Sequence, residues 1–247
     1  MNNLTSIIIF GLLMSIASLS GRIIMFFRKQ TQTILLLPLI AFSAGSLIGG
    51  AFFLMIPAGL HSFDNIKTFF LYLIAGFSLF FILEQFLHVH HCKKAESDCR
   101  KPMSYLILIG GGLHTLVGGI SIAGLFIIDF RIGFLAWLGA VFHEIPRGFG
   151  DFAVLVHSGW EKKRALLYNF FSSLTFLIGG LITYFISSKI DISFLIPFAA
   201  GNFIYIGATD LIPEVNKHTT LKNNVIHFLF FAIGIFLMFA LSYGHNH

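Results

Sequence analysis

The sequence predicts an all-α membrane protein, a bundle of eight transmembrane helices with both termini on the extracytoplasmic side. First, 56% of the 247 residues are hydrophobic and only 11% are charged, with a mean hydropathy of +0.86. A soluble domain carries about 25% charged residues. Second, the apolar residues form segments near or above the roughly 20 residues that a helix needs to cross a bilayer. Third, Lys and Arg gather in the short connections between these segments, as orientation signals do.

Eight apolar segments follow one another without a linker or a second domain, so residues 1–247 are expected to form one polytopic domain. The segments cover approximately residues 4–27, 33–60, 67–90, 103–128, 132–157, 165–187, 192–213 and 224–243. The first continues to Phe27 without a small-residue cleavage site, and we expect it to remain as a spanning helix.

The basic residues set the predicted orientation. With the N-terminus outside, the cytoplasmic connections carry Arg28, Lys29, Lys93, Lys94, Arg100, Lys101, Lys162, Lys163, Arg164, Lys217 and Lys222. The opposite side carries only Lys67, Arg131 and Lys189. This asymmetry explains the net charge of +5, so the predicted partner is the lipid bilayer and not a nucleic acid.

The most polar connection, residues 91–102, is predicted to face the cytoplasm, where its two cysteines stay reduced. The cluster of His88, His90, His91, Cys92 and Cys99 is a plausible soft-metal site there. We favour a patch of interfacial histidines, because the cluster follows a helix end and has no fixed geometry.

Small residues mark the expected close contacts between helices, because they let backbones approach each other in lipid. They crowd the second segment (Ala41, Ala44, Gly45, Gly49, Gly50), the fourth (Gly110, Gly111, Gly112, Gly118, Gly119) and the seventh (Ala199, Ala200, Gly201).

The fifth segment carries ionisable residues at membrane depth. His143, Glu144, Arg147 and Asp151 share one face of a helix at about 100° per residue. A charge at the bilayer centre costs roughly 2.5–3.5 kcal/mol even on a lenient scale, so such a cluster predicts a functional site. Pro146 is expected to kink the helix and to free a backbone carbonyl one turn earlier.

The candidate metal ligands are His114 in the fourth segment and His143 with Glu144 in the fifth, because imidazole and carboxylate bind zinc, iron(II) and manganese(II) alike. Thr115 is expected to line the same site. His114 alone could equally hydrogen-bond a neighbouring helix. Arg147 has an alternative role as an internal salt bridge to Glu144 at i,i+3 or to Asp151 at i,i+4.

At these residues the chain resembles the ZIP family of divalent-metal transporters. The resemblance is carried in order by Ala44–Gly49 with Ile56-Pro57, Gly76-Phe77 through Glu84 to His91, His143–Pro146 with Gly150–Ala153, and Ala199–Ile206 with Asp210–Glu214. It covers nearly the whole chain and implies eight spans with external termini. It also implies transport of a divalent cation through a site on the fourth and fifth helices, with His114, His143 and Glu144 as ligands.

The chain departs from the family pattern at several ligand positions. The family's fourth helix has His-Asn-x-x-Asp-Gly, where this chain has His114, Thr115 and Gly118. The fifth has His-Glu-x-Pro-His-Glu, where this chain has Arg147 and Gly148 at the last two positions. The second helix usually has His and Glu near its end, where this chain has Leu54 and Ala58. An arginine cannot ligate a metal, so we expect the paired-metal site to be lost and at most one weak site to remain.

Three functions are compatible with this pattern. The first is a ZIP-like permease that moves zinc, iron or manganese towards the cytoplasm by alternating access. The second is a non-transporting homologue in which Arg147 replaces the charge of the metal and which scaffolds a partner. The third is an intramembrane metalloprotease, because His143-Glu144-x-x-Arg147 is one residue from the His-Glu-x-x-His zinc motif.

We favour the first function and expect no enzyme and no cofactor besides the transported cation. The metalloprotease is remote, because Arg147 replaces its second zinc ligand and no third ligand is evident. We expect the inner membrane of a prokaryote. The metal, the energy source and a homodimeric state are left open by the sequence.

Overall fold

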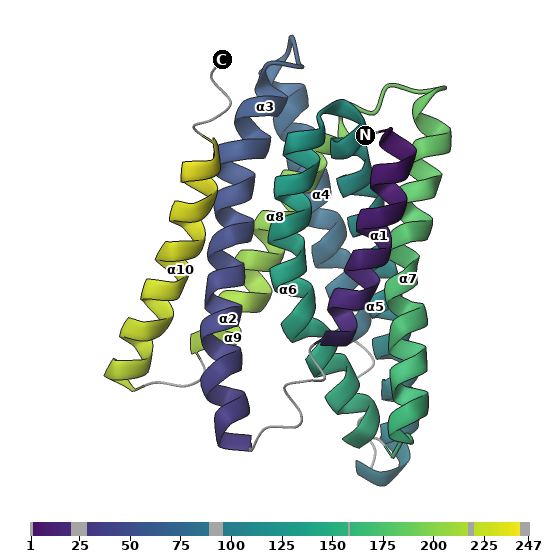
Figure 1. Cartoon of the computed structure of the whole chain (residues 1–247), viewed down its shortest axis with the longest axis vertical. Helices are drawn as coiled ribbons and strands as arrows, with labels where there is room; N and C mark the ends of the chain where they lie inside the picture. Colours follow the sequence, from purple (N-terminus) through teal and green to yellow (C-terminus); the bar gives the residue numbers. More distant parts are fainter. Residues whose placement is uncertain (1, 21–28, 89–95, 158, 217–219, 243–247) are drawn as a thin grey trace.

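The computed structural model describes residues 2–20, 29–88, 96–157, 159–216 and 220–242, and every regular element in these ranges is helical (Figure 1). The elements are α1 (Asn3–Ser20), α2 (Lys29–Gly50), η2 (Ala51–Met55), α3 (Ile56–Leu60), α4 (Ile66–His88), α5 (Glu96–Ile128), α6 (Phe130–His157), α7 (Lys162–Ser187), α8 (Leu195–Tyr205), η3 (Ile206–Leu211), α9 (Ile212–Asn216) and α10 (Leu221–Ser242).

These elements make eight passes through the bundle, because α2, η2 and α3 follow one another as one rod and α8, η3 and α9 as another. Within the described residues, seven passes are long and apolar enough to cross a membrane. The pass outside this set is α6, which has 28 residues but carries the ionisable face. The all-helical membrane fold is thus confirmed, and the charged face of α6 lies inside the bundle, against other helices.

The predicted boundaries shift by several residues at some ends. α5 begins at Glu96, seven positions before the predicted 103, and α1 is described only to Ser20, with residues 21–28 outside the described chain. Cys92 and the segment 89–95 also lie outside it, as does the side chain of Cys99. The predictions on the cysteines and the histidine cluster therefore stay predictions.

The two interrupted rods share a local cause. Each contains a π-helical turn that ends shortly before a proline, Pro57 in one rod and Pro213 in the other. A proline ring lacks an N–H and crowds the carbonyl four residues earlier. A wider turn moves that carbonyl away, so both helices continue past their prolines. Such turns often lie beside functional sites.

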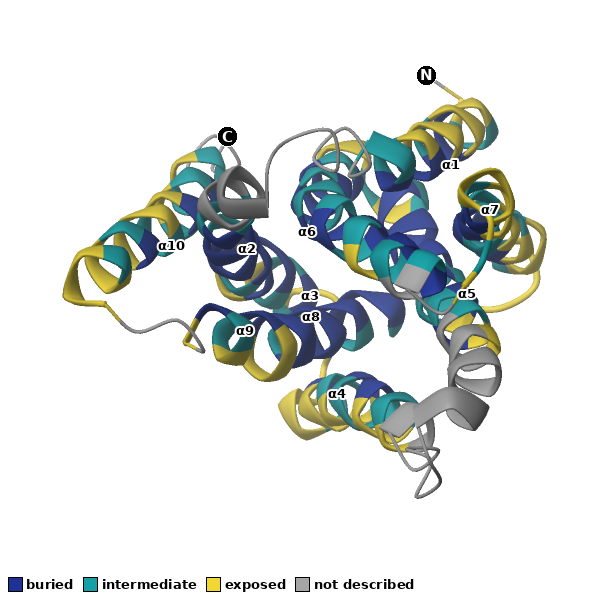
Figure 2. Cartoon of the chain, turned by 90° about the horizontal axis from the view of Figure 1, so that it is seen from below, coloured by how far each residue is buried: buried dark blue, intermediate teal, exposed yellow. Residues whose placement is uncertain are grey.

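The helices fall into a central group and two flanking pairs. α1, α5, α6 and α7 pack against one another, whereas α10 packs on α2 and α4 packs on α8 (Figures 1 and 2). α5 and α7 interlock through glycines: a Cβ on Gly119 would lie 2.0 Å from the Phe176 carbonyl oxygen, and one on Gly179 would lie 2.2 Å from that of Leu116. The predicted use of small residues as contacts is confirmed here and at Gly45 and Gly201.

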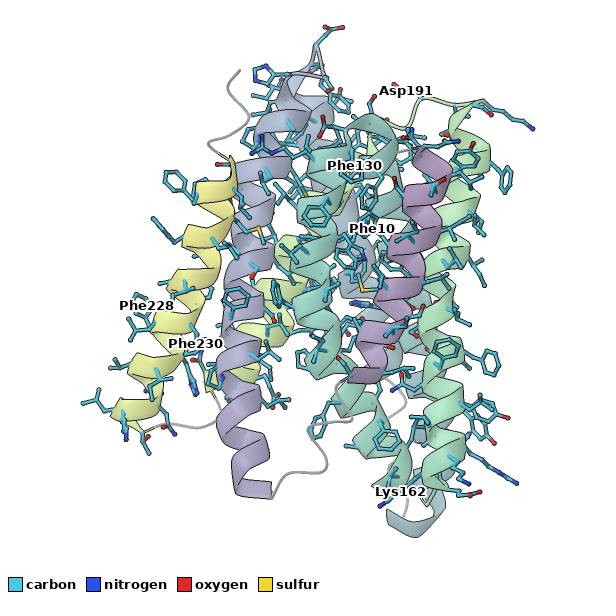
Figure 3. All side chains as sticks on the ribbon, viewed as in Figure 1. Phe10, Phe130, Lys162, Asp191, Phe228 and Phe230 are labelled. Carbon is cyan, nitrogen blue, oxygen red and sulfur yellow. The ribbon has the colours of Figure 1, made fainter. Side chains whose placement is uncertain are left out.

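The outward faces of α4, α7 and α10 are apolar and exposed, which suits contact with lipid (Figure 2). Phe228 and Phe236 on α10 are 67% and 68% exposed, and Phe185 on α7 is 65% exposed. α1 begins and α10 ends at the same end of the bundle. Figure 3 places Asp191 at that end and Lys162 at the opposite one.

Candidate metal site

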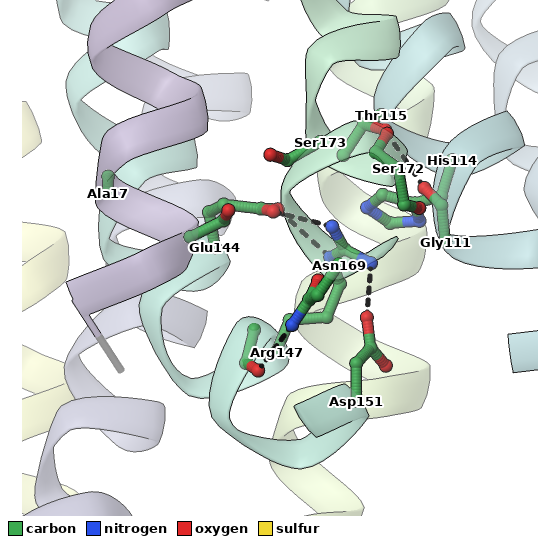
Figure 4. Close-up of polar contacts among 12 residues, drawn as sticks. Ala17, Gly111, His114, Thr115, Glu144, Arg147, Asp151, Asn169, Ser172 and Ser173 are labelled. Carbon is green, nitrogen blue, oxygen red and sulfur yellow. Dashed lines mark hydrogen bonds and ion pairs between the residues drawn. The ribbon is translucent and has the colours of Figure 1, made fainter. Parts of the chain in front are cut away.

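The ionisable face of α6 is buried in the bundle, and its charges pair within the helix. Arg147 donates from Nε to Glu144 Oε2 at 2.9 Å and from Nη2 to Glu144 Oε1, and Nη1 donates to Asp151 Oδ2 at 2.9 Å (Figure 4). Glu144 is only 3% exposed. One arginine therefore holds both carboxylates, and both of the alternative salt bridges that the spacing allowed are formed.

A glycine on the neighbouring helix makes room for this arrangement. A Cβ on Gly111 of α5 would lie 2.9 Å from Arg147 Nη1 and 3.3 Å from Asp151 Oδ2. Arg147 therefore lies against the backbone of α5. Gly111 leaves space for the guanidinium group of Arg147, a role beyond the helix packing predicted for the glycines of this segment.

The two histidines meet between α5 and α6 beside the ion cluster, since His143 directly precedes Glu144. His114 Nε2 and His143 Nε2 lie 3.3 Å apart and share a hydrogen bond. A zinc ion bound tetrahedrally at 2.0–2.1 Å from two nitrogens would hold them about 3.3–3.4 Å apart. The separation of the two atoms therefore already suits a shared cation, although the present ring orientation serves a hydrogen bond.

The two imidazole rings differ in the contacts that hold their orientation. The His114 ring packs edge-on against Phe80, with centroids 4.9 Å apart. His143 is 5% exposed, and its Nδ1 has no hydrogen-bond partner. A histidine that ligates a metal nearly always donates its second ring N–H to a carboxylate, a carbonyl or water, which strengthens the ligand. Without that support, His143 is a weaker ligand than its burial suggests.

The histidine pair lines a cavity of about 40 Å³, and we call this cavity the midplane cavity. It takes residues from every pass except α10: Met14, Leu47, Phe80, His114, Thr115, Gly118, Ser121, Ile122, Ala140, His143, Glu144, Phe176, Asn202, Phe203 and Ile206. A water molecule occupies about 10–15 Å³ on this measure. The cavity has room for a single ion or a few waters.

The structure brings together part of the predicted site. His114, His143, Glu144 and Thr115 line one cavity, whereas Arg147 and Asp151 lie beside it along α6. The Thr115 hydroxyl is engaged with α7, at 2.6 Å from Thr175 Oγ1. Among the described residues, no three His, Cys, Asp or Glu side chains form a group that could hold a metal ion. Both oxygens of the Glu144 carboxylate accept hydrogen bonds from Arg147 in this conformation. The role of Glu144 as a metal ligand stays a prediction.

Ser43 on α2 is a site residue that the sequence reasoning missed. Its Oγ lies 2.6 Å from the carbonyl oxygen of Phe142, which is the carbonyl that Pro146 leaves without an N–H partner in α6. The same hydroxyl lies 2.7 Å from Leu39 O in its own helix. Ser43 thus ties α2 to α6 one residue before His143. The signal for it was the proline, because a freed carbonyl at membrane depth needs a donor from another helix.

Asn202 on α8 is the second residue that was missed. It is 2% exposed, lines the midplane cavity and donates from Nδ2 to Ser121 Oγ at 3.3 Å. It lies in the stretch Ala199–Ile206 that carries the family resemblance, which gave no sign of its orientation.

Gly148 shows why one family position is closed to a carboxylate here. A Cβ at Gly148 would lie 2.3 Å from the carbonyl oxygen of Ser18 in α1. The backbone of α1 therefore occupies the place where a family member has its second glutamate. The Gly118 position is open by contrast, since the nearest atom to a Cβ there is 3.8 Å away on Phe176.

A helical bundle with apolar outer faces and a buried cluster of imidazoles and paired charges is typical of integral membrane proteins with a functional site between their helices. The ZIP Zinc transporter family model matches residues 90–242, and the chain belongs to this family. It is 32% identical over 148 residues to zinc transporter zipt-7.2 of Caenorhabditis elegans, covering 58% of this chain and 32% of that protein.

Two further relatives are also zinc transporters by name. The chain is 30% identical over 162 residues to the zinc transporter ZIP13 homolog of Drosophila melanogaster, covering 63% of this chain and 45% of the relative. It is 25% identical to zinc transporter ZIP13 of Mus musculus over 249 residues, covering 83% and 69%. The chain spans about a third of the first relative and less than half of the second.

Proposed function

We propose that this chain moves a divalent metal cation across the membrane towards the cytoplasm and that the cation passes through the midplane cavity. The observation that carries the proposal is the His114–His143 pair, whose Nε2 atoms lie 3.3 Å apart on a buried cavity inside a ZIP-family bundle. Imidazole nitrogens suit zinc and iron(II) better than manganese(II), and zinc is the metal named for the relatives.

The charges beside the cavity make this a weak site. Glu144 is neutralised by Arg147, so the cation meets imidazole nitrogens and no free carboxylate. Metal affinity rises with the number and negative charge of the ligands, so a site without a free carboxylate binds a cation weakly. Weak binding is compatible with transport, because a carrier must release its cation on the far side.

A second candidate is favoured by the same ion cluster. Arg147 supplies a fixed cation bonded to both carboxylates of α6, which keeps the helix neutralised without any metal. A homologue balanced in this way could serve as a scaffold without transporting. The metalloprotease is disfavoured, because its general base would be Glu144 and both of that residue's oxygens are bonded to Arg147.

Uptake of zinc into vesicles that contain the purified protein and a zinc-sensitive dye inside tests the proposal. We expect uptake above protein-free vesicles and a loss of about tenfold or more in His114→Ala and in His143→Ala. The matched control is His227→Ala, since His227 is a buried histidine on α10, the pass that does not line the cavity. Wild-type uptake at the protein-free level would favour the scaffold, and equal uptake by the wild type and both histidine variants would overturn the proposed pathway.

Inward direction and a prokaryotic inner membrane belong to the same proposal. The direction rests on the family resemblance, and the relatives named above are all animal proteins, which leaves the membrane a prediction. Vesicles sorted by orientation, with the Lys162 end inside or outside, separate the two directions of transport.

A further inference from the structure

Asn202 presents an unpartnered oxygen inside the bundle. The residue is 2% exposed, and its Oδ1 has no hydrogen-bond partner, while its Nδ2 donates to Ser121 Oγ at 3.3 Å. Buried polar atoms in proteins nearly always have a partner, because an unsatisfied acceptor loses its hydration without compensation. An oxygen in this state, on the wall of a cavity, indicates that something occupies the cavity and contacts it.

The neighbours of Asn202 restrict what that occupant is. The cavity also presents His114 and His143, whose imidazoles accept metals when neutral, and it has room for one ion. The hydroxyl of Thr115 is bonded to α7, and Glu144 is bonded to Arg147. Ser121 Oγ accepts from the amide of Asn202, and the remaining donor atoms in the lining are the Met14 thioether, the two imidazole Nε2 atoms and the Asn202 amide oxygen. Of these nitrogen and oxygen atoms, the amide oxygen is the one that is buried without a partner.

We propose that Asn202 Oδ1 is the third protein ligand of the transported cation, supplied by α8 to the histidine pair on α5 and α6. This inference rests on the proposed function and adds a ligand to it. Ser121 orients the amide by accepting from its nitrogen, which leaves the oxygen as the unbonded end of a side chain that lines the cavity. The bound cation joins α8, which packs on α4, to the central group of helices.

The proposal predicts a particular metal preference. An amide oxygen is a hard ligand that suits manganese, whereas imidazole alone suits zinc. Removal of the amide should therefore weaken manganese binding more than zinc binding. A purely structural role for Asn202 would lower both affinities together through the stability of the fold.

The test is calorimetric titration of the purified chain in detergent with Zn²⁺ and with Mn²⁺. We expect Asn202→Ala to weaken Mn²⁺ binding about tenfold or more, with a smaller loss for Zn²⁺. Asn202→Asp keeps the shape and adds a charge, so it should bind both metals more tightly than the wild type. The matched control is Asn169→Ala, which removes another buried asparagine, one bonded to the Gly148 carbonyl and outside the cavity.

The outcomes separate this inference from the proposed function. If His114→Ala loses Zn²⁺ binding but Asn202→Ala binds both metals like the wild type, Asn202 holds only a water and the inference fails while the histidine site stands. If Asn202→Ala and Asn169→Ala lose both metals equally, the effect is structural and the inference also fails. A wild type that binds neither metal overturns both the inference and the proposed site.

Discussion

At the scale of single residues, the charge of Arg147 is balanced within its own helix. Its guanidinium group bonds Glu144 one turn earlier and Asp151 one turn later, in the space that the missing side chain of Gly111 leaves on α5. The spacing of these residues predicted each pair as an alternative. The spacing could not show that both pairs form at once, because that depends on the room that Gly111 of α5 leaves for the guanidinium group.

Removal of Arg147 should destabilise the protein strongly. Arg147→Ala leaves two carboxylates in the bundle without their cation, and breaking a buried pair in this way costs about 3–5 kcal/mol of unfolding free energy. The control is Arg164→Ala, which breaks the exposed pair with Glu161, 3.7 Å apart, and should cost about 0–1 kcal/mol. Melting temperatures in detergent measure both. Equal melting temperatures for the two variants would contradict a structural role for the Arg147 cluster.

At the scale of elements, prolines and glycines decide how the helices meet. Pro146 does not end α6, which runs from Phe130 to His157. The freed carbonyl that the sequence predicted is present, and the sequence could not identify its donor, because Ser43 comes from a helix about a hundred residues away. The glycine clusters predicted the close contacts, but the individual partner of each glycine, such as Ser18 for Gly148, depends on the packing of whole helices.

The Ser43–Phe142 contact can be measured with a double-mutant cycle. Ser43→Ala should cost about 1–3 kcal/mol, because the Phe142 carbonyl becomes a buried acceptor without a partner. In a Pro146→Ala background the new N–H of residue 146 bonds that carbonyl, so the cost should shrink. Ser46→Ala is the control, since its hydroxyl bonds only Phe42 O of its own helix, at 2.7 Å. An unchanged cost of Ser43→Ala in the two backgrounds would rule out the contact.

The approach of α1 to α6 gives a second prediction at this scale. Gly148→Ala places a methyl group 2.3 Å from the Ser18 carbonyl oxygen and should cost about 1–3 kcal/mol as the helices separate. Gly150→Ala lies two residues on, has no atom within 4 Å of the new Cβ, and should be neutral or stabilising by up to about 1 kcal/mol. Thermal melts of the two variants compare them directly. A stable Gly148→Ala protein would contradict the packing of α1.

This packing also changes how a family-like ligand set can be restored. Changing Arg147 to His, Gly148 to Glu and Gly118 to Asp follows from the sequence alone. The structure leaves room for a side chain at Gly118 but closes Gly148 to any side chain while α1 keeps its place. The double variant Arg147→His with Gly118→Asp is therefore the one that tests ligand restoration.

At the scale of the whole molecule, eight passes bring the start of α1 and the end of α10 to one end of the bundle. Segment lengths and composition predicted these passes well, because each spanning helix must be long and apolar. The pass outside the set of seven apolar spans, α6, is the one that carries the ionisable face, and it was recognised from that polar face. The shape of the midplane cavity could not be predicted, because seven passes contribute to its wall.

The orientation in the membrane is testable with single cysteines. In a protein with Cys92→Ser and Cys99→Ser, we expect Asp191→Cys to react with a membrane-impermeant thiol reagent on intact cells. Lys162→Cys, at the opposite end of the bundle, should react only after permeabilisation (Figure 3). The reverse pattern would invert the predicted orientation and move both termini to the cytoplasm.

The measurement that tests the central claim most directly is anomalous X-ray diffraction from crystals of the protein grown with zinc. The account predicts one zinc peak in the midplane cavity, about 2.0–2.1 Å from Nε2 of both His114 and His143. Arg147 should remain bonded to Glu144 in that structure. Crystals that show zinc only at other positions, with the two imidazoles still hydrogen-bonded to each other, would contradict it.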